Sequence, residues 1–504
     1  MIALAGSGRR GRWLAALAGA VLPLSFAPFH FYPLAIVSAA LLLALWDGQS
    51  PRESAWRGFI FCFAAFATGT HWIFISLHDF GGAPVPVVLV LMVGLWCLMA
   101  SYTALAGYVS AHIAVASRAL RWCLVWPAAF ILFDWVRMWL FTGFPWFALG
   151  YSQLDGPLRG WAPVVGVYGL SFVTLALAGA LLTALRGTRT DRIGVGVAVL
   201  IVAAATFAIY DRDWTIPADD TLEVRLIQGG IPQDRKWLPQ QLEPTLRMYR
   251  DLTFAEPHPG LVVWPEVAVP AIAYQVREYL DEVDRQAAAQ GMQVYLGVLT
   301  RDDVTGQYRN SLIGLGTNNA QYHKRHLVPF GEFFPVPDMI RHWMRSAGLP
   351  NQDTLPGDDD QPPLPVADWS LAPSICYEDA FGTELHAFLP EAGVLINVSN
   401  DAWFGDSIAA DQHLQIAQMR SLETGRETLR VTNTGITAMI GADGRIVSRL
   451  PQFETGVLHG EVRPRTGATP YVRSGNVPII IICLLLIGFG YLTCRQSVLS
   501  LPAD

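Results

Sequence analysis

The chain has 504 residues, which is too long for a single hydrophobic core. Hydrophobic residues make up 52% of it and charged residues only 15%, against about 25% in soluble proteins, so the composition indicates a membrane protein with a soluble part attached. The formal net charge of −7 argues against a nucleic-acid-binding protein, which needs a basic face to neutralise phosphates.

Long apolar runs dominate the N-terminal part of the chain, and one more lies near the C-terminus. A membrane-spanning helix needs about 20 apolar residues. On this basis we predict eight spans, at residues 13–29, 32–47, 56–77, 84–113, 122–141, 162–185, 194–210 and 477–493. The predicted domains are a transmembrane bundle (1–212), a soluble domain (218–466) and a C-terminal transmembrane helix (475–495).

Arginines are distributed unevenly among the loops between these spans. Arg9, Arg10 and Arg12 precede the first span and more arginines lie in every second loop, whereas the segments APFHFYP and HDFGGAPVP contain no Lys or Arg. By the positive-inside rule both termini are cytoplasmic and residues 218–466 lie on the outer face. This predicts a multi-pass protein of the bacterial inner membrane with a periplasmic soluble domain.

Two charged residues lie inside the fifth predicted span. Asp134 and Arg137 are three residues apart, so they can pair on one face of the helix. A structural ion pair and a functional site are both compatible with this spacing.

In the soluble domain, short β-rich runs alternate with helical stretches. The predicted strands are 222–228, 261–264, 293–299, 311–316, 371–376, 394–399, 428–433, 436–441 and 446–450, with helices at 241–254, 271–289, 379–389 and 409–425. Because the strands are continuous apolar runs, they predict sheets buried on both faces in an α/β layered fold. The turn GADGRI predicts a hairpin between the last two strands.

Three reactive residues follow strands or loops of this domain: Glu266 in LVVWPE, Lys324 in YHKRH and Cys376 in SICYEDAF. A carboxylate can serve as general base, an ammonium group can stabilise an oxyanion, and a cysteine can form a thioester. Taken singly, each residue has an ordinary structural interpretation as well. Cys376 could be a small buried side chain, Glu266 a helix cap, and Lys324 part of a solvated basic turn.

The other five cysteines lie in or at the ends of apolar segments, so no disulfide is expected in the soluble domain. No Cys/His spacing in the sequence suggests a metal site.

Taken together, these segments resemble the nitrilase superfamily and its Glu-Lys-Cys triad. The whole chain resembles the bacterial apolipoprotein N-acyltransferase family, in which such a domain is fused to a membrane bundle. The resemblance rests on the eight spans and on FTGFPW…GYSQ, QGGIPQDRKW, WPE, YHKRHLVPFGE, ICYE, NVSNDAWFG and TNTGITAMIG. It implies an αββα sandwich for the soluble domain.

The resemblance also implies roles for individual residues. Glu266 matches the general base, Lys324 the catalytic lysine and Cys376 the nucleophile. The supporting positions are Glu332, which assists the lysine, Tyr377 and Glu378 beside the nucleophile, Trp237 at the substrate entrance, and Asn310 in the pocket.

The implied reaction transfers the sn-1 acyl chain of a phospholipid, through a thioester, to the N-terminal amine of a diacylglyceryl-cysteine in an apolipoprotein. It needs no metal or organic cofactor. The alternative is a membrane-tethered amidase that releases the acyl group to water. A transporter with a sensor domain would require charges through the bundle and internal repeats, and the sequence has only the Asp134–Arg137 pair and no clear repeat. The apolar residues of 339–349 suggest a mobile lid or an ordinary surface helix.

Overall fold

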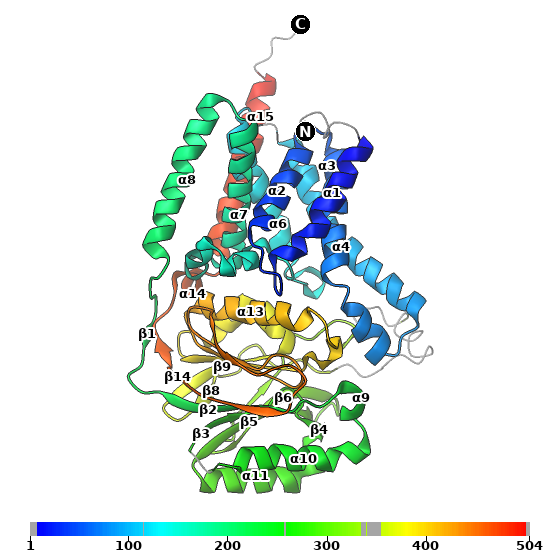
Figure 1. Ribbon diagram of the computed structural model, residues 1–504, viewed down its shortest axis with the longest axis vertical. Coiled ribbons are helices and arrows are strands. Elements are labelled where there is room, and N and C mark those ends of the chain that lie inside the picture. The colour runs from blue at the N-terminus through cyan, green and yellow to red at the C-terminus, as the bar shows by residue number, and fades with distance from the viewer. Residues whose placement is uncertain (1–7, 114, 257–258, 334–338, 340–353, 500–504) are drawn as a thin grey trace. The chain divides into compact units, whose positions relative to one another are not determined.

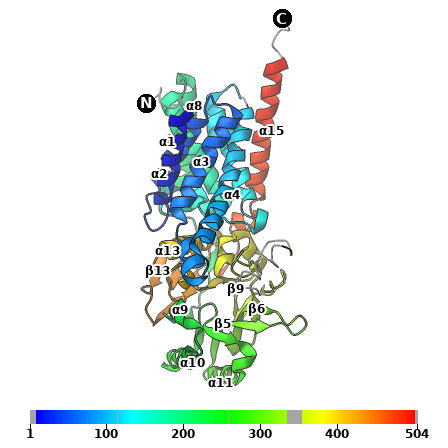
Figure 2. The same ribbon diagram turned by 90° about the vertical axis from the view of Figure 1, so that its right-hand side faces the viewer.

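The computed structural model describes residues 8–113, 115–256, 259–333, 339 and 354–499. The chain forms two compact units, one of Met1–Phe74, Pro84–Arg212 and Arg473–Asp504 and the other of Ile75–Ala83 and Asp213–Val472 (Figures 1 and 2). Apart from Met339, the predicted lid lies outside the described residues.

The first unit is helical. Its main helices are α1 (Gly8–Val21), α2 (Pro33–Trp46), α3 (Pro51–Gly69), α4 (Val85–His112), α6 (Trp126–Val136), α7 (Ala162–Arg186), α8 (Arg189–Ile209) and α15 (Val477–Leu499). Each predicted span therefore contains a helix. α15 packs against α6 and α7, so the last helix of the chain joins the helices of the N-terminal part in one bundle.

Four helical segments of the described chain are long and apolar enough to cross a membrane: Val85–His112, Arg118–Val136, Pro157–Arg186 and Arg189–Ile209. The helix α2 has only 14 residues, and α3 carries Arg52, Glu53 and Arg57 near its start. The total of eight crossings therefore stays a prediction.

The predicted ion pair in the fifth span is confirmed. Arg137 Nε donates to Asp134 Oδ1 at 3.0 Å, and both side chains are buried. Arg137 Nη1 also donates to the carbonyl of Trp146 at 2.7 Å. The pair therefore holds the aromatic FTGFPW segment against α6, which is a structural role.

The second unit contains two extended sheets. The first has the order β13-β12-β11-β10-β9-β8 and the second β14-β2-β3-β5-β6-β7, with β4 paired to β5. Their strands are β2 (Leu222–Gln228), β3 (Gly260–Val263), β4 (Val269–Ile272), β5 (Met292–Arg301), β6 (Tyr308–Gly316), β7 (Gln321–His323), β8 (Leu364–Val366), β9 (Trp369–Ile375), β10 (Val394–Ser399), β11 (Thr428–Thr432), β12 (Ala438–Ile440), β13 (Ile446–Arg449) and β14 (Gly456–Val462).

The two sheets pack face to face, with a helical layer on each outer side (Figure 1). Successive side chains of β2 point to opposite faces of the sheet and fill two cores. Leu226 belongs to the core between the sheets, and Ile227 belongs to the core beneath the outer helices. α10 (Pro239–Phe254) and α11 (Arg277–Ala289) cover the second sheet, and α13 (Ala409–Thr424) covers the first. The predicted αββα sandwich is confirmed.

Two predicted helices differ from the structure. Residues 379–389 are not one helix but parts of two 3₁₀ helices, η8 (Cys376–Ala380) and η9 (Gly382–Phe388), because the backbone of Phe381 is not helical. The helix predicted at 271–289 begins only at Arg277, after β4 and a short 3₁₀ turn. Among the strands that were not predicted, β7 and β8 have three residues each, which is too short for a hydrophobic period.

Candidate active site

The three predicted catalytic residues come from three strand ends. Glu266 lies three residues beyond β3, Lys324 directly follows β7, and Cys376 directly follows β9 as the first residue of η8. The core between the sheets includes residues of all three strands, and Cys376 packs against it. These strand ends therefore bring together residues that are far apart in sequence.

Lys324 is held between two carboxylates. Its Nζ lies 2.9 Å from Glu332 Oε1 and 3.4 Å from Glu266 Oε1, and the side chain is only 1% exposed. Asn310 Nδ2 donates to both acids, at 2.7 Å to Glu266 and 3.2 Å to Glu332. Burial by itself lowers the pKa of Lys324, but Glu332 and Glu266 outweigh burial and raise it, so the group stays an ammonium.

Glu266 lies in a tight turn after β3. The backbone at Val267 has φ 44°, and the turn crosses directly over Gly297 of β5. A Cβ at Gly297 would approach the carbonyl oxygen of Pro265 to 2.4 Å and Glu266 Cα to 2.7 Å. Only glycine at 297 lets the turn at Glu266 approach the sheet this closely.

Cys376 has a left-handed backbone, with φ 53°, which costs a non-glycine residue about 1–2 kcal/mol. Burial raises the pKa of its thiol well above the usual range, and the Glu266 and Asp401 carboxylates raise it further. Lys324 and the Ser399 side chain act in the opposite direction. The thiol is therefore protonated at rest and needs a base before it can attack.

Glu378 is buried two residues after Cys376 and connects two parts of the site. Its carboxylate accepts hydrogen bonds from the backbone N–H of Ile375 (2.6 Å), Arg325 (2.6 Å) and His326 (3.1 Å), and from the hydroxyl of Tyr322 (2.9 Å). Burial raises the pKa of Glu378, although the backbone bonds from Ile375 and Arg325 oppose this. The residue ties the strand end before Cys376 to the loop that follows Lys324.

The remaining predicted residues lie around this centre. The ring of Tyr377 packs edge-on against Phe381 at 5.0 Å and against His326 at 5.8 Å. Trp237 follows the short helix α9 (Gln233–Lys236), and half of its side-chain surface is exposed. The expected place of Trp237 at a substrate entrance stays a prediction.

Sequence reasoning missed Lys236, which precedes Trp237. Its side chain is 1% exposed, and Nζ donates to the backbone carbonyl of Glu266 at 3.3 Å. Burial lowers the pKa of Lys236 to about 8. No local pattern distinguishes this lysine from a surface lysine, because its burial depends on the distant turn at Glu266.

Four further charged residues escaped prediction and lie beside Cys376: Asp379, Asp401, His413 and Arg430. Arg430 lies on the strand predicted at 428–433, and every residue of β11 is buried in the structure. Within the described residues, no group of three or more His, Cys, Asp or Glu side chains is arranged to hold a metal ion.

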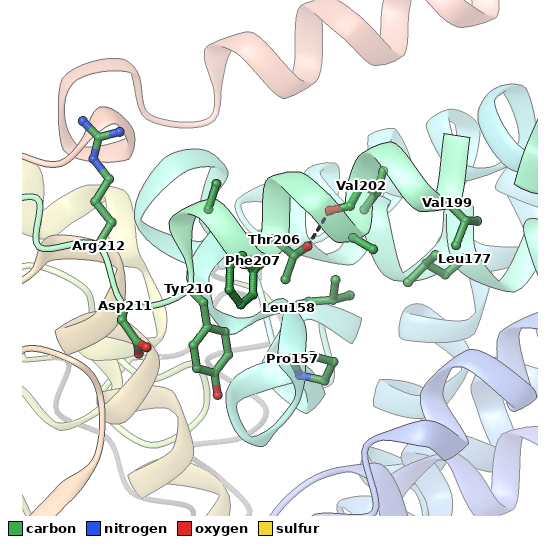
Figure 3. Close-up of a pocket in the computed structure, with 12 residues that line it drawn as sticks. Pro157, Leu158, Leu177, Val199, Val202, Thr206, Phe207, Tyr210, Asp211 and Arg212 are labelled. Carbon is green, nitrogen blue, oxygen red and sulfur yellow. Dashed lines mark hydrogen bonds between the residues drawn. The ribbon is translucent and has the colours of Figure 1, made fainter. Parts of the chain in front are cut away.

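A cavity of 650 Å³ lies in the helical unit and contains none of the predicted site residues (Figure 3). It is lined mainly by apolar side chains of α7, α8 and the segment before α7, among them Leu158, Leu177, Val199, Val202 and Phe207. The Thr206 hydroxyl donates to the Val202 carbonyl, and the polar lining residues Tyr210, Asp211 and Arg212 directly follow α8.

Comparison with known proteins covers both units. A family model described as the apolipoprotein N-acyltransferase N-terminal domain matches residues 18–180, and a carbon-nitrogen hydrolase model matches residues 224–471. The chain is 42% identical to apolipoprotein N-acyltransferases of Methylococcus capsulatus and Azotobacter vinelandii. Each alignment covers 97% of this chain, with 97% and 96% of the two relatives. A carbon-nitrogen hydrolase structure from Helicobacter pylori G27 covers 48% of this chain and 89% of its own, at 15% identity and a TM-score of 0.37.

Proposed function

The chain belongs to the apolipoprotein N-acyltransferase family, and on this premise we propose that it moves the sn-1 acyl chain of a phospholipid, through a thioester on Cys376, to the N-terminal amine of a diacylglyceryl-cysteine in an apolipoprotein. One observation carries the proposal. The buried ammonium of Lys324, bonded to Glu266 and Glu332, acts electrostatically on the Cys376 thiol. A base, a cation and a protonated thiol are then present together.

In the first half-reaction, Glu266 takes the thiol proton while Cys376 Sγ bonds to the ester carbonyl carbon. The carbonyl oxygen becomes an oxyanion, which Lys324 and the backbone N–H after Cys376 stabilise. When this intermediate collapses, the carbon–oxygen ester bond breaks. The leaving lysophospholipid oxygen takes the proton from Glu266, and the acyl group remains on sulfur.

The second half-reaction uses the same groups in the same order. The neutral amine of the acceptor attacks the thioester carbonyl, and Glu266 takes a proton from the nitrogen. The carbon–sulfur bond then breaks, an amide forms, and the thiolate recovers its proton from Glu266. The two half-reactions share one site, so the donor product leaves before the acceptor binds.

The membrane helices fit substrates that are both lipid-anchored. Each acyl CH₂ contributes about 0.8 kcal/mol to staying in lipid, so a freely diffusing enzyme would rarely meet them. The alternation of arginine-rich and arginine-poor loops supports a catalytic unit on the periplasmic side of the inner membrane.

The test uses purified enzyme, phospholipid labelled in its sn-1 chain, and a synthetic diacylated lipopeptide. We expect one acyl mass on Cys376 in the absence of lipopeptide, and its transfer to the peptide amine when lipopeptide is added. Cys376→Ser should show neither event. If label appears only as free fatty acid while the peptide mass is unchanged, the chain is a hydrolase and the proposed transfer is wrong.

A further inference from the structure

Four buried charged side chains that the proposed reaction does not use surround the backbone of the nucleophile. They are Asp379 of η8, Asp401 of η10 (Asp401–Phe404), His413 of α13 and Arg430 of β11, and they are called the ion cluster below. Each is at most 3% exposed. His413 contacts both acids at 2.9 Å, and Arg430 contacts Asp379 at 3.1 Å and Asp401 at 3.0 Å.

The ion cluster is balanced in charge. Burial and Arg430 lower the pKa of His413, but Asp379 and Asp401 outweigh them and raise it to about 9. His413 is therefore an imidazolium near neutral pH, and both of its N–H groups donate. Buried ion networks of this kind are weak evidence for stability, because well-packed apolar side chains of similar volume often serve equally well. Another role is needed to explain four charges at this place.

The ion cluster is bonded to the nucleophile's main chain. The carbonyl oxygen of Cys376 accepts from Asn397 Nδ2 at 3.2 Å and lies 3.3 Å from His413 Nε2. Arg430 Nη1 in turn donates to Asn397 Oδ1 at 2.8 Å, and Asp379 belongs to the same short helix as Cys376. A left-handed backbone at a non-glycine residue persists only when its surroundings hold it.

We propose that the ion cluster is a positioning device that holds the Cys376 carbonyl, and with it the left-handed backbone, so that the thiol faces Glu266 and Lys324. The proposal rests on the proposed role of Cys376 as nucleophile. The four residues act through the cysteine and touch no substrate. Asp401 also accepts from the Ser399 hydroxyl at 3.0 Å, and Ser399 lowers the pKa of the thiol, so the ion cluster reaches the sulfur side as well.

Two variants test the proposal at different points. His413→Gln removes the charge and one of the two donors. Asn397→Ser keeps all four charges and removes the amide that links Arg430 to the Cys376 carbonyl, which also donates to Ser374 Oγ at 3.0 Å. The matched control is Glu423→Gln on α13, which neutralises one side of an equally buried ion pair with Arg420 (3.0 Å); this pair lies against Gly382 of η9. Each protein is compared in thermal unfolding, in acyl transfer, and in iodoacetamide alkylation of Cys376 followed by peptide mass.

We expect kcat to fall about 10- to 100-fold in both variants while KM stays within about threefold, because misplacing a nucleophile by about 1 Å costs roughly this much. The pH midpoint of Cys376 alkylation should move by about half a unit or more, since the thiol changes its distances from nearby charges. Glu423→Gln should lower the unfolding temperature and change neither quantity.

Wild-type kcat and an unmoved alkylation midpoint in Asn397→Ser would overturn the proposal, whether or not His413→Gln folds. Alkylation needs no lipid substrate. If the wild-type enzyme transferred no acyl chain and the alkylation midpoint still moved, the proposed function would be wrong and the positioning role would stand.

Discussion

Replacing Lys324 by methionine separates the electrostatic role of this residue from its packing role. Methionine keeps most of the side-chain volume but leaves Glu266 and Glu332 facing each other across Asn310 without a cation. Because Lys324 is only 1% exposed, breaking this buried pair should lower the free energy of unfolding by about 3–5 kcal/mol. Loss of an oxyanion-stabilising donor should lower kcat by about 10²- to 10³-fold.

The double variant Lys324→Met/Glu332→Gln decides between the two roles. The Glu332→Gln substitution removes the repulsion between the carboxylates of Glu266 and Glu332. We therefore expect most of the lost stability to return while acyl-enzyme formation stays slow. Stability is measured by thermal unfolding in detergent, and acyl-enzyme formation by quenched-flow intact mass with phospholipid. If the double variant regains wild-type rates together with its stability, Lys324 serves only to neutralise Glu332, and its assignment as a catalytic group is refuted.

Three more changes test other parts of the site. Gly297→Ala should lower kcat about tenfold or more with only modest destabilisation, because the new Cβ displaces Glu266. An unchanged rate would show that the turn at Glu266 can shift without displacing its carboxylate. The stabilisation due to protonated His413, whose pKa is raised from 6.5 to about 9, should be fully present below pH 6.5 and lost as pH rises through 9. This stabilisation is measured as the unfolding temperature at a series of pH values. His413→Gln should remove the pH dependence, and an identical dependence in the variant would contradict its assignment to His413. Lys236→Met should raise the unfolding temperature at pH 7, because burial penalises the ammonium form of Lys236. A marked loss of stability would instead mean that the hydrogen bond from Lys236 to the Glu266 carbonyl outweighs this penalty.

Much of the fold follows from local patterns. The strands predicted at 222–228 and 394–399, both rich in β-branched and other apolar residues, have these bounds in the structure. The segment after Cys376 shows the limit of such reasoning. A helix was predicted at 379–389, but the non-helical backbone of Phe381 divides the segment into two short 3₁₀ helices.

The sequence by itself determined the division into an apolar helical part and an α/β part, because hydrophobic periodicity is a property of neighbouring residues. It also identified the residue types that acyl transfer needs, through Glu266, Lys324 and Cys376. Their supporting contacts were decided only by the tertiary structure. The register that pairs Ser374 of β9 with Asn397 of β10 brings that asparagine to the Cys376 carbonyl, and the carboxylates of Asp379 and Asp401 at the same place keep His413 a cation. Such effects depend on distances between residues far apart in the chain, which no local pattern encodes.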